Sequence, residues 1–398
     1  MKNFLFAFAA TSLLLTSCGK DDDNPKPKPQ DPPVNPEAIV LGDINQNRIL
    51  EDRIADPNLP DYLVNQNISV AAELTIRPGV VIAFAEDVTM LFEDKGAIFA
   101  RGEADKKIRF IGKLPQKGYW TGLDIYSINS GNELTYTEIL HAGSKALAEN
   151  IKANIFLHDR ARLSVKNSLI SQSGGYGMFM RDGSNLISFA GNTISNNTEA
   201  PLKMPGSNVP KLDAATAYTG GNGRNVIEIT PASWITGTSE VVWPAFNDNT
   251  PYRFLGSTSV QTGWKLMPGT TIEFAPDQEF EVATGGYLNA VGTAAKKIVI
   301  TGVDKTVGSW KGFIVYSRSS SNVLEHTEVK YAGGLNMLSG VKAAVTVTDH
   351  SSLDMRNSAV TNSGGYGIHV NGNGQVNSDI ETANTFTANA SQPVIYTQ

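Results

Sequence analysis

Three short segments alternate apolar residues with aromatic and polar residues in a way that suits a sugar-binding surface. Apolar residues occupy every second position, as in a β-strand with one face in a core. The residues between them would point outward, and aromatic rings with Asp, Asn, His and Arg fit the apolar faces and hydroxyl groups of sugars. The predicted ligand-binding residues are Asp124, Tyr126, Asn154, Phe156, His158, Phe179 and Arg181. The alternative is an aromatic ladder that only stabilises the fold.

These segments form one surface only if their strands lie side by side, and a long internal repeat indicates how they are arranged. The repeated motifs are Arg77-Pro78-Gly79 and Met267-Pro268-Gly269, Trp120-Thr121-Gly122 and Trp310-Lys311-Gly312, and Ser173-Gly174-Gly175-Tyr176-Gly177 and Ser363-Gly364-Gly365-Tyr366-Gly367. The two members of each pair are 190 residues apart. A repeat without insertions over this length implies that its internal spacing matters physically.

Short apolar segments separated by Gly, Asn, Asp and Lys fill both copies, and no helical period is sustained. Their starts recur at intervals of about 25 residues, as a parallel β-helix requires, because each coil adds one strand to each of two or three sheets. The spacing predicts two ladders of stacked residues. The first is Ile82, Ile108, Leu134, Leu163 and Ile187, and the second is Ile98, Leu123, Ile155 and Met178.

We therefore expect an all-β fold, a right-handed parallel β-helix built from two tandem copies of about 190 residues. Copy 1 is predicted to span residues 38–215 and copy 2 residues 216–398. Two segments near the junction, Asn225–Ile229 and Ser239–Trp243, also have the pattern of strands. This favours one continuous solenoid over two packed domains.

Polar and aromatic residues that both copies retain are further candidates for chemistry. Glu138 and Glu328 each follow a Thr in a predicted strand and could act as acids, although a solvated ladder position explains them as well. Trp120 and Trp310 are predicted to pack at a corner, with stacking on a ligand as the alternative. A third pair, Asn167 and Asn357, is predicted to occupy turns in the left-handed conformation.

The bulk composition narrows the classes of partner. The formal net charge is −6, which argues against nucleic acid because binding to phosphates requires a basic surface. The chain has 37 glycines and is rich in Asn, Ser and Thr, which predicts many turns. Its single cysteine is Cys18, so no disulfide within the chain is expected.

Residues 1–37 have targeting features rather than features of a packed fold. Phe4–Leu15 is an apolar run of about a dozen residues, which is too short to span a membrane and suits a secretory signal. Leu15-Thr16-Ser17-Cys18 resembles a bacterial lipobox, so residues 1–17 are predicted to be a signal peptide and Cys18 the lipidated residue. A cysteine in an ordinary signal peptide is the alternative. Residues 18–37 contain three consecutive Asp and six Pro residues, which predicts an acidic, Pro-rich tether.

Several motifs resemble those of right-handed parallel β-helix lipoproteins of Bacteroidetes, which have a pectin-lyase-like fold. They are Lys20-Asp21-Asp22 close after Cys18, Thr75-Ile76-Arg77-Pro78-Gly79, Trp120-x-Gly122-Leu123, Asn132-Glu133-Leu134-x-Tyr136 and Asn167-Ser168-x-Ile170. The resemblance covers nearly the whole chain after Cys18. It implies a cell-surface protein that is lipid-anchored in the outer membrane through Cys18 and faces the exterior.

The pectin-lyase-like fold also hosts enzymes that cleave polysaccharides, but their motifs are missing after residue 37. That part has no Asp-Asp pair, and Gly174–Gly177 contains Tyr176 where the hydrolases would have a His. The histidines show no metal-ligand spacing, and none shares a repeat position with another. They are His141, His158, His326, His350 and His369. We therefore assign no catalytic residue, no metal site and no cofactor.

The expected function is non-enzymatic binding of a polysaccharide, a host or cell-surface glycan, or another extracellular macromolecule, in adhesion or capture. A polysaccharide lyase or glycoside hydrolase is one alternative, and a structural spacer is another. A deep groove with clustered carboxylates and an Arg or Lys would favour the enzyme. Because the copies share mainly turn and core residues, a local function is expected where they differ.

Overall fold

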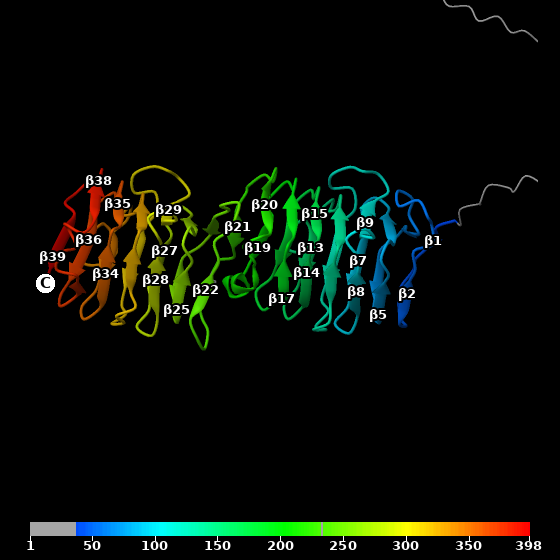
Figure 1. Cartoon of the computed structure of the whole chain (residues 1–398), viewed down its shortest axis with the longest axis horizontal. Coiled ribbons are helices and arrows are strands. Elements are labelled where there is room, and N and C mark those ends of the chain that lie inside the picture. The colour runs from blue at the N-terminus through cyan, green and yellow to red at the C-terminus, as the bar shows by residue number, and fades with distance from the viewer. Residues whose placement is uncertain (1–36, 232–233) are drawn as a thin grey trace, which may run out of the picture. The chain divides into compact units, whose positions relative to one another are not determined.

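The computed structural model describes residues 37–231 and 234–398, which form an all-β parallel β-helix (Figure 1). Residues Glu37–Gln398 make one compact unit. The predicted signal peptide, Cys18 and the tether up to residue 36 lie outside the described residues.

Strands of the described residues belong to five sheets, of eight, thirteen, six, six and six strands. The eight-stranded sheet lies in copy 1 except for its last strand, which is just past the predicted boundary at residue 215. It contains β1 (Ile39–Val40), β3 (Tyr62–Val64), β6 (Val81–Phe84), β9 (Ile108–Gly112), β12 (Thr137–Leu140), β15 (Leu169–Ser171), β18 (Thr193–Ser195) and β20 (Ala217–Gly220).

The thirteen-stranded sheet runs through both copies. It contains β4 (Ile68–Val70), β7 (Thr89–Phe92), β10 (Gly122–Ile125), β13 (Ala153–Leu157), β16 (Tyr176–Met180), β19 (Leu202–Met204), β21 (Ile227–Ile229), β23 (Tyr252–Phe254), β26 (Thr271–Phe274), β29 (Ile298–Gly302), β32 (Thr327–Lys330), β35 (Ala359–Thr361) and β38 (Thr385–Thr387). All of its strand pairings are parallel.

The three six-stranded sheets complete the coils. The sheet of copy 1 contains β2 (Arg48–Leu50), β5 (Glu73–Ile76), β8 (Ala97–Arg101), β11 (Glu133–Thr135), β14 (Arg162–Lys166) and β17 (Asn185–Ala190). One sheet of copy 2 contains β22 (Val241–Trp243), β25 (Gly263–Leu266), β28 (Tyr287–Val291), β31 (Val323–Glu325), β34 (Ser352–Arg356) and β37 (Gln375–Val376). The other contains β24 (Thr258–Val260), β27 (Glu279–Val282), β30 (Gly312–Val315), β33 (Ala343–Val347), β36 (Tyr366–Asn371) and β39 (Val394–Thr397). A 3₁₀ helix, η1 (Gly206–Lys211), follows β19.

The predicted ladders combined strands that lie in different sheets. Ile82 and Ile108 belong to the eight-stranded sheet, whereas Leu134 and Leu163 belong to a six-stranded one. Ile187 is exposed rather than inward-facing. The paired inward residues are instead Ile82, Phe110, Ile139, Ile170 and Ile194, all of them buried. The error arose because all three strands of a coil recur at similar intervals, so spacing alone does not tell the sheets apart.

Equivalent strands of the two copies do not occupy the same sheet. Strand β10 lies in the thirteen-stranded sheet, but its counterpart 190 residues later, β30, lies in a six-stranded sheet. The thirteen-stranded sheet continues in copy 2 through β29, which is the counterpart of β9. Equivalent surfaces of the two copies therefore do not form one continuous face.

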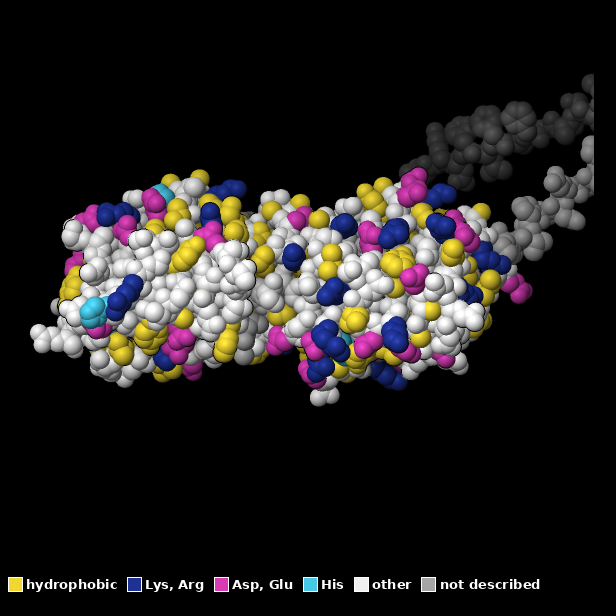
Figure 2. Space-filling view, turned by 90° about the horizontal axis from the view of Figure 1, so that it is seen from below, with side chains coloured by type: hydrophobic (Ala, Val, Ile, Leu, Met, Phe, Trp, Pro, Cys, Tyr) yellow, Lys and Arg dark blue, Asp and Glu magenta, His cyan; other side chains and the backbone are white. Residues whose placement is uncertain are grey.

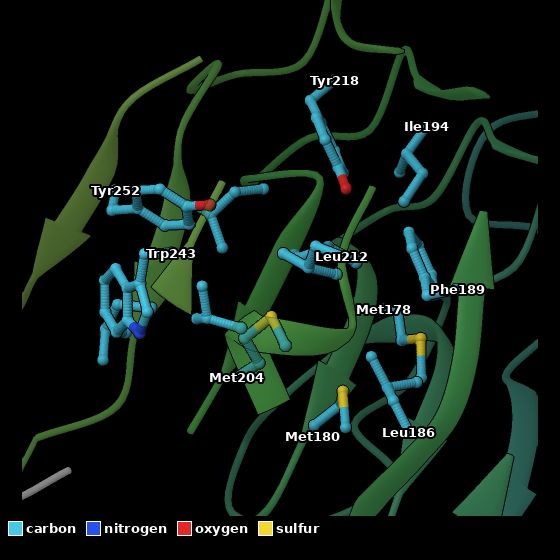
Figure 3. Packing of buried hydrophobic residues seen from close by; sticks show 14 of the residues in the cluster. Met178, Met180, Leu186, Phe189, Ile194, Met204, Leu212, Tyr218, Trp243 and Tyr252 are labelled. Atoms are coloured by element: carbon cyan, nitrogen blue, oxygen red, sulfur yellow. The ribbon is translucent and has the colours of Figure 1, made fainter. Parts of the chain in front are cut away.

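One apolar core runs from Leu41 to Val394 without a break at the junction. Figure 3 shows the junction, where Met178 and Phe189 of copy 1 and Trp243 and Tyr252 of copy 2 belong to the same cluster. The side chains inside each coil stack on those of the next coil, so neighbouring coils stabilise one another.

The retained pairs have structural roles in both copies. Trp120 stacks on Phe84 with 4.0 Å between ring centroids, and Trp310 stacks on Phe274 at 4.8 Å. Both tryptophans are fully buried, which confirms the packing prediction. Asn167 and Asn357 each have a φ of 50°, which confirms the left-handed turns.

Glu138 and Glu328 form ion pairs along the outside of the coils. The Glu138 carboxylate lies 3.1 Å from both Lys107 Nζ and Arg109 Nε, and Glu328 Oε1 lies 2.9 Å from Lys297 Nζ. Ion pairs of this kind contribute little stability, about 0–1 kcal/mol. The same Lys–Glu ion pair therefore forms in both copies.

Candidate functional site

The predicted ligand-binding residues of copy 1 lie side by side, as the strand alternation implied. They come from β10, β13 and β16, which are neighbours in the thirteen-stranded sheet. Asp124 is paired with Phe156, and Phe156 with Phe179. The rings of Phe156 and Phe179 have centroids 4.8 Å apart. The sequence therefore located a real aromatic cluster outside the main core.

The loop between β12 and β13 covers this cluster, so the expectation of an open aromatic stripe is wrong. Leu147, Ala148 and Ile151 of the loop pack on the rings. Phe156 is 0 % exposed and Phe179 is 5 % exposed. The predicted site residue Arg181 forms an ion pair with Glu149 of the same loop, which adds a polar contact at its edge.

The polar members of the predicted site bond to the protein itself. Asn154 is buried; its Oδ1 accepts a hydrogen bond from Ala142 N at 3.0 Å, and its Nδ2 donates to Ser171 O at 3.0 Å. His158 Nε2 and Asp124 Oδ1 are 2.7 Å apart, and both side chains are buried. A His–Asp pair can act as a general base, but here the imidazole is closed off from an external substrate.

Tyr126 is the most accessible of the predicted residues, at 39 % exposed. Its ring stacks on His158 with 3.6 Å between centroids. Burial, together with the Asp124 carboxylate, raises the pKa of Tyr126 above its ordinary value. The phenol therefore stays neutral at physiological pH and can present one ring face and a hydroxyl to solvent.

The corresponding sheet of copy 2 carries an open groove, which we call the β27 groove. Its volume is about 300 Å³. The residues that define it are Trp234, Ser259, Glu279, Glu281, Lys311 and Tyr316, with Met337 of the loop between β32 and β33 at one border. The side chains come from β24, β27, β30 and the segments beside them, so several successive coils contribute.

Two accessible aromatic side chains line the β27 groove. Trp234 is 56 % exposed and Tyr316 is 40 % exposed. Burial raises the pKa of Tyr316, and the nearby carboxylates of Glu281 and Glu279 raise it further. Exposed rings with a polar edge are suited to partners that are apolar on one face and polar at the rim, as sugars are.

Strand β27 places two carboxylates on the groove side. Phe280 and Val282 point into the core, so Glu279 and Glu281 point outward by strand alternation. Glu279 Oε2 lies 2.8 Å from Lys311 Nζ. Glu281 Oε1 accepts a hydrogen bond from Ser259 Oγ at 2.8 Å. Acceptors for sugar hydroxyls thus lie in the same groove as the aromatic rings.

Sequence reasoning missed this groove for two reasons. Trp234 aligns with Ile44 at the repeat offset of 190, so the repeat gave it no aromatic counterpart. The alternation of Glu279 and Glu281 with Phe280 and Val282 was a usable signal, and Tyr316 occupies the repeat position of Tyr126. What the sequence could not show is that four coils bring these residues into one depression.

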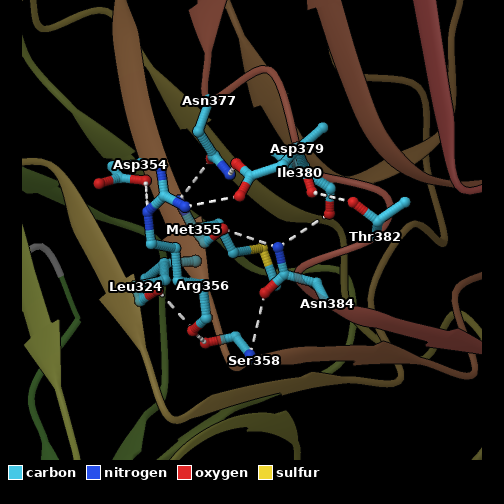
Figure 4. Close-up of polar contacts among 10 residues, drawn as sticks. All are labelled: Leu324, Asp354, Met355, Arg356, Ser358, Asn377, Asp379, Ile380, Thr382 and Asn384. Carbon is cyan, nitrogen blue, oxygen red and sulfur yellow. Dashed lines mark hydrogen bonds and ion pairs between the residues drawn. The ribbon is translucent and has the colours of Figure 1, made fainter.

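A second cavity in copy 2, of about 670 Å³, lacks an aromatic platform. It is lined mostly by polar residues of β34, β37 and the segments beside these strands, including Arg356 and Asp354. Figure 4 shows Arg356 held between Asp354, 3.1 Å away, and Asp379, 2.7 Å away. The Arg356 guanidinium is already paired with two carboxylates, and no Trp, Tyr or Phe of the described residues lines the cavity, so it offers weaker grounds for ligand recognition than the β27 groove.

Beside the covered aromatic cluster of copy 1 is a cavity of about 440 Å³, lined by Arg181, Asp182, Lys203 and Phe179 among others. Lys203 Nζ lies 5.7 Å from the Phe179 ring centroid and 5.6 Å from that of Tyr176, so its charge is already directed at these rings. This cavity brings two of the predicted residues together, but Phe179 exposes almost none of its ring there.

The charged residues form no single-sign field on the face seen in Figure 2. Lys and Arg side chains are interspersed with Asp and Glu over copy 1, on the right, and the copy 2 half of this face carries fewer charges. Across residues 37–231 and 234–398, no group of three or more His, Cys, Asp or Glu side chains is placed to hold a metal ion. Nor does this part contain a helix with the length and hydropathy that a membrane crossing requires.

Comparisons of the chain with protein-family models, with curated proteins and with solved structures found no significant match. The class of protein is therefore defined by its fold and by its candidate site alone. The described residues form a parallel β-helix solenoid with an aromatic, acidic groove on the side of copy 2.

Proposed function

We propose that this protein is a non-enzymatic glycan-binding β-helix that captures its ligand in the β27 groove. The observation that carries the proposal is the presence of two accessible aromatic residues, Trp234 and Tyr316, in one groove with Glu279 and Glu281. Sugar rings stack on aromatic faces while their hydroxyl groups donate to carboxylates. Copy 1 has Thr89 and Leu91 at the positions of the two glutamates, so the site belongs to copy 2.

Replacing Trp234 by alanine is expected to weaken glycan binding by about tenfold or more, because an aromatic anchor at the centre of an interface carries much of the binding energy. The full chain is first screened on a glycan array, and the bound glycan is then titrated by calorimetry. If the Trp234→Ala and Tyr316→Ala variants both bind the glycan as tightly as the wild type does, the glycan binds elsewhere on the protein.

A cleavage activity is the second candidate, and one observation favours it. Glu279 and Glu281 are alternate residues of one strand, so their Cα atoms lie about 6.5–7 Å apart. Glycoside hydrolases use a pair of Asp or Glu side chains that flank the scissile bond. Against this candidate, Lys311 neutralises Glu279, and the groove is open to solvent. Incubation of the wild type with polysaccharides should release no cleavage product. If the wild type does release product and the Glu279→Gln variant does not, the protein is an enzyme instead.

The location of the protein is also part of the proposal. The lipobox-like Leu15-Thr16-Ser17-Cys18 and the following Lys20-Asp21-Asp22 support a lipid anchor at the outer face of an outer membrane. Multiple acyl chains on one cysteine would give stable anchoring.

Cys18→Ser is expected to move the protein from the detergent phase to the aqueous phase when cells are extracted and the phases are separated. Ser17→Ala keeps a small residue before Cys18 and should leave the protein in the detergent phase. Surface exposure is read by adding protease to whole cells. Detergent-phase partitioning of Cys18→Ser would contradict the anchor.

A further inference from the structure

The β27 groove contains an uncompensated negative charge. Its ionised side chains are Glu279, Glu281 and Lys311. Lys311 is committed to Glu279, with 2.8 Å between Nζ and Oε2. Glu281 has the Ser259 hydroxyl as a partner, and no basic side chain of the described residues lies within ion-pair distance of it. The three charges leave a net charge of about −1 beside the aromatic rings.

This charge lies where a bound sugar would make its contacts. Glu281 projects from the middle strand of the groove, between the segment that carries Ser259 and the segment that carries Tyr316. Its paired residue in β30 is Ile314, which is nearly buried and brings no opposite charge. A carboxylate that lines a groove attracts cationic ligand groups and repels anionic ones.

Copy 1 shows that the charge is a specific property of this site. The residues that correspond to Glu279, Glu281 and Lys311 are Thr89, Leu91 and Thr121, none of which is charged. Nothing in the stacking of the coils therefore requires carboxylates at these positions. Because the fold does not require charged residues at these positions and they face the groove, a ligand that binds in the groove explains them best.

We infer that the β27 groove selects glycans that carry a free amino group, such as glucosamine units, over neutral glycans and against uronic acid glycans. The inference rests on the proposed glycan-binding function. The ammonium group of the sugar would donate a charge-assisted hydrogen bond to Glu281, while Trp234 and Tyr316 contact the ring faces. Uronate carboxylates would instead face Glu281 across a short distance and be repelled.

The test compares three oligosaccharides of equal length on the full chain by calorimetry: oligomers of glucosamine, of N-acetylglucosamine and of galacturonic acid. We expect the glucosamine oligomer to bind about tenfold more tightly than its acetylated form, and the galacturonate oligomer to bind most weakly. Raising the salt concentration should reduce the difference because the charges are near the surface.

Two substitutions should change this preference in opposite directions. Glu281→Gln keeps an acceptor for Ser259 and removes the charge, so the preference for the amino sugar should fall to about twofold or less. Lys311→Gln removes the cation and should increase the preference. Equal affinities in the wild type, tighter binding of galacturonate, or an unchanged preference in Glu281→Gln would overturn the inference. If the N-acetylated oligomer binds through Trp234 without any preference, only this inference fails, whereas absence of all binding contradicts the proposed function as well.

Discussion

Replacing Trp310 by alanine is expected to lower the free energy of unfolding by about 3–5 kcal/mol. Trp310 is fully buried and stacks on Phe274 with an interplanar angle of 9°. Its indole Nε1 donates a hydrogen bond to Lys330 O at 2.8 Å. The substitution removes this packing and leaves a carbonyl without its donor, and each loss is destabilising. Denaturant unfolding followed by far-UV circular dichroism measures the change.

Trp234→Ala is the matched control, because it deletes the same side chain from an exposed position. Surface substitutions usually change stability by less than about 0.5 kcal/mol, so this variant should unfold at nearly the same denaturant concentration as the wild type. A similar loss of stability in both variants would mean that Trp234 is a structural residue, and its role in the β27 groove would have to be abandoned.

Phe156→Ala is expected to destabilise the protein by about 3–5 kcal/mol while leaving glycan affinity unchanged. Phe156 is fully buried, and its ring centroid lies 4.8 Å from that of Phe179 and 4.5 Å from that of His158. The covering loop rests on this cluster through Leu147 and Ile151, so its attachment should weaken too. Hydrogen exchange of the loop amides should therefore be faster in Phe156→Ala than in the wild type. It is measured together with the free energy of unfolding and the glycan affinity.

The equivalent residue of copy 2, Thr346, provides the comparison. It is also buried, and its hydroxyl donates a weak hydrogen bond to Met337 Sδ, in the loop between β32 and β33, at 3.8 Å. Thr346→Ala should therefore cost about 1 kcal/mol. A loss of glycan binding in Phe156→Ala with stability preserved would return the ligand site to copy 1, where the sequence alone placed it.

The β-helix could be predicted from the sequence because the residues that produce it recur periodically. Corner residues, inward aliphatics and turn asparagines recur at spacings that the coil dictates, and the buried tryptophans recur with them. The assignment of strands to ladders failed for a related reason. Ile108 and Leu134 are separated by a whole-coil interval, yet they lie in different sheets, because loops of different length occur at different corners.

The candidate site was only partly predictable, because exposure depends on which loop lies over a strand. Alternation correctly placed Phe156 and Phe179 side by side outside the core. It could not show that Leu147 and Ile151 fold over them. The β27 groove was harder to find, since Trp234, Glu281 and Tyr316 come from different coils and no local pattern joins them.

The comparison of Tyr316→Ala with Tyr126→Ala tests the central claim most directly. The two tyrosines occupy the same repeat position and are 40 % and 39 % exposed, so the substitutions are closely matched. Titration of both variants with the glycan that the wild type binds should show about tenfold weaker binding for Tyr316→Ala and no change for Tyr126→Ala. Equal weakening in both, or a loss confined to Tyr126→Ala, would contradict a ligand site in the β27 groove.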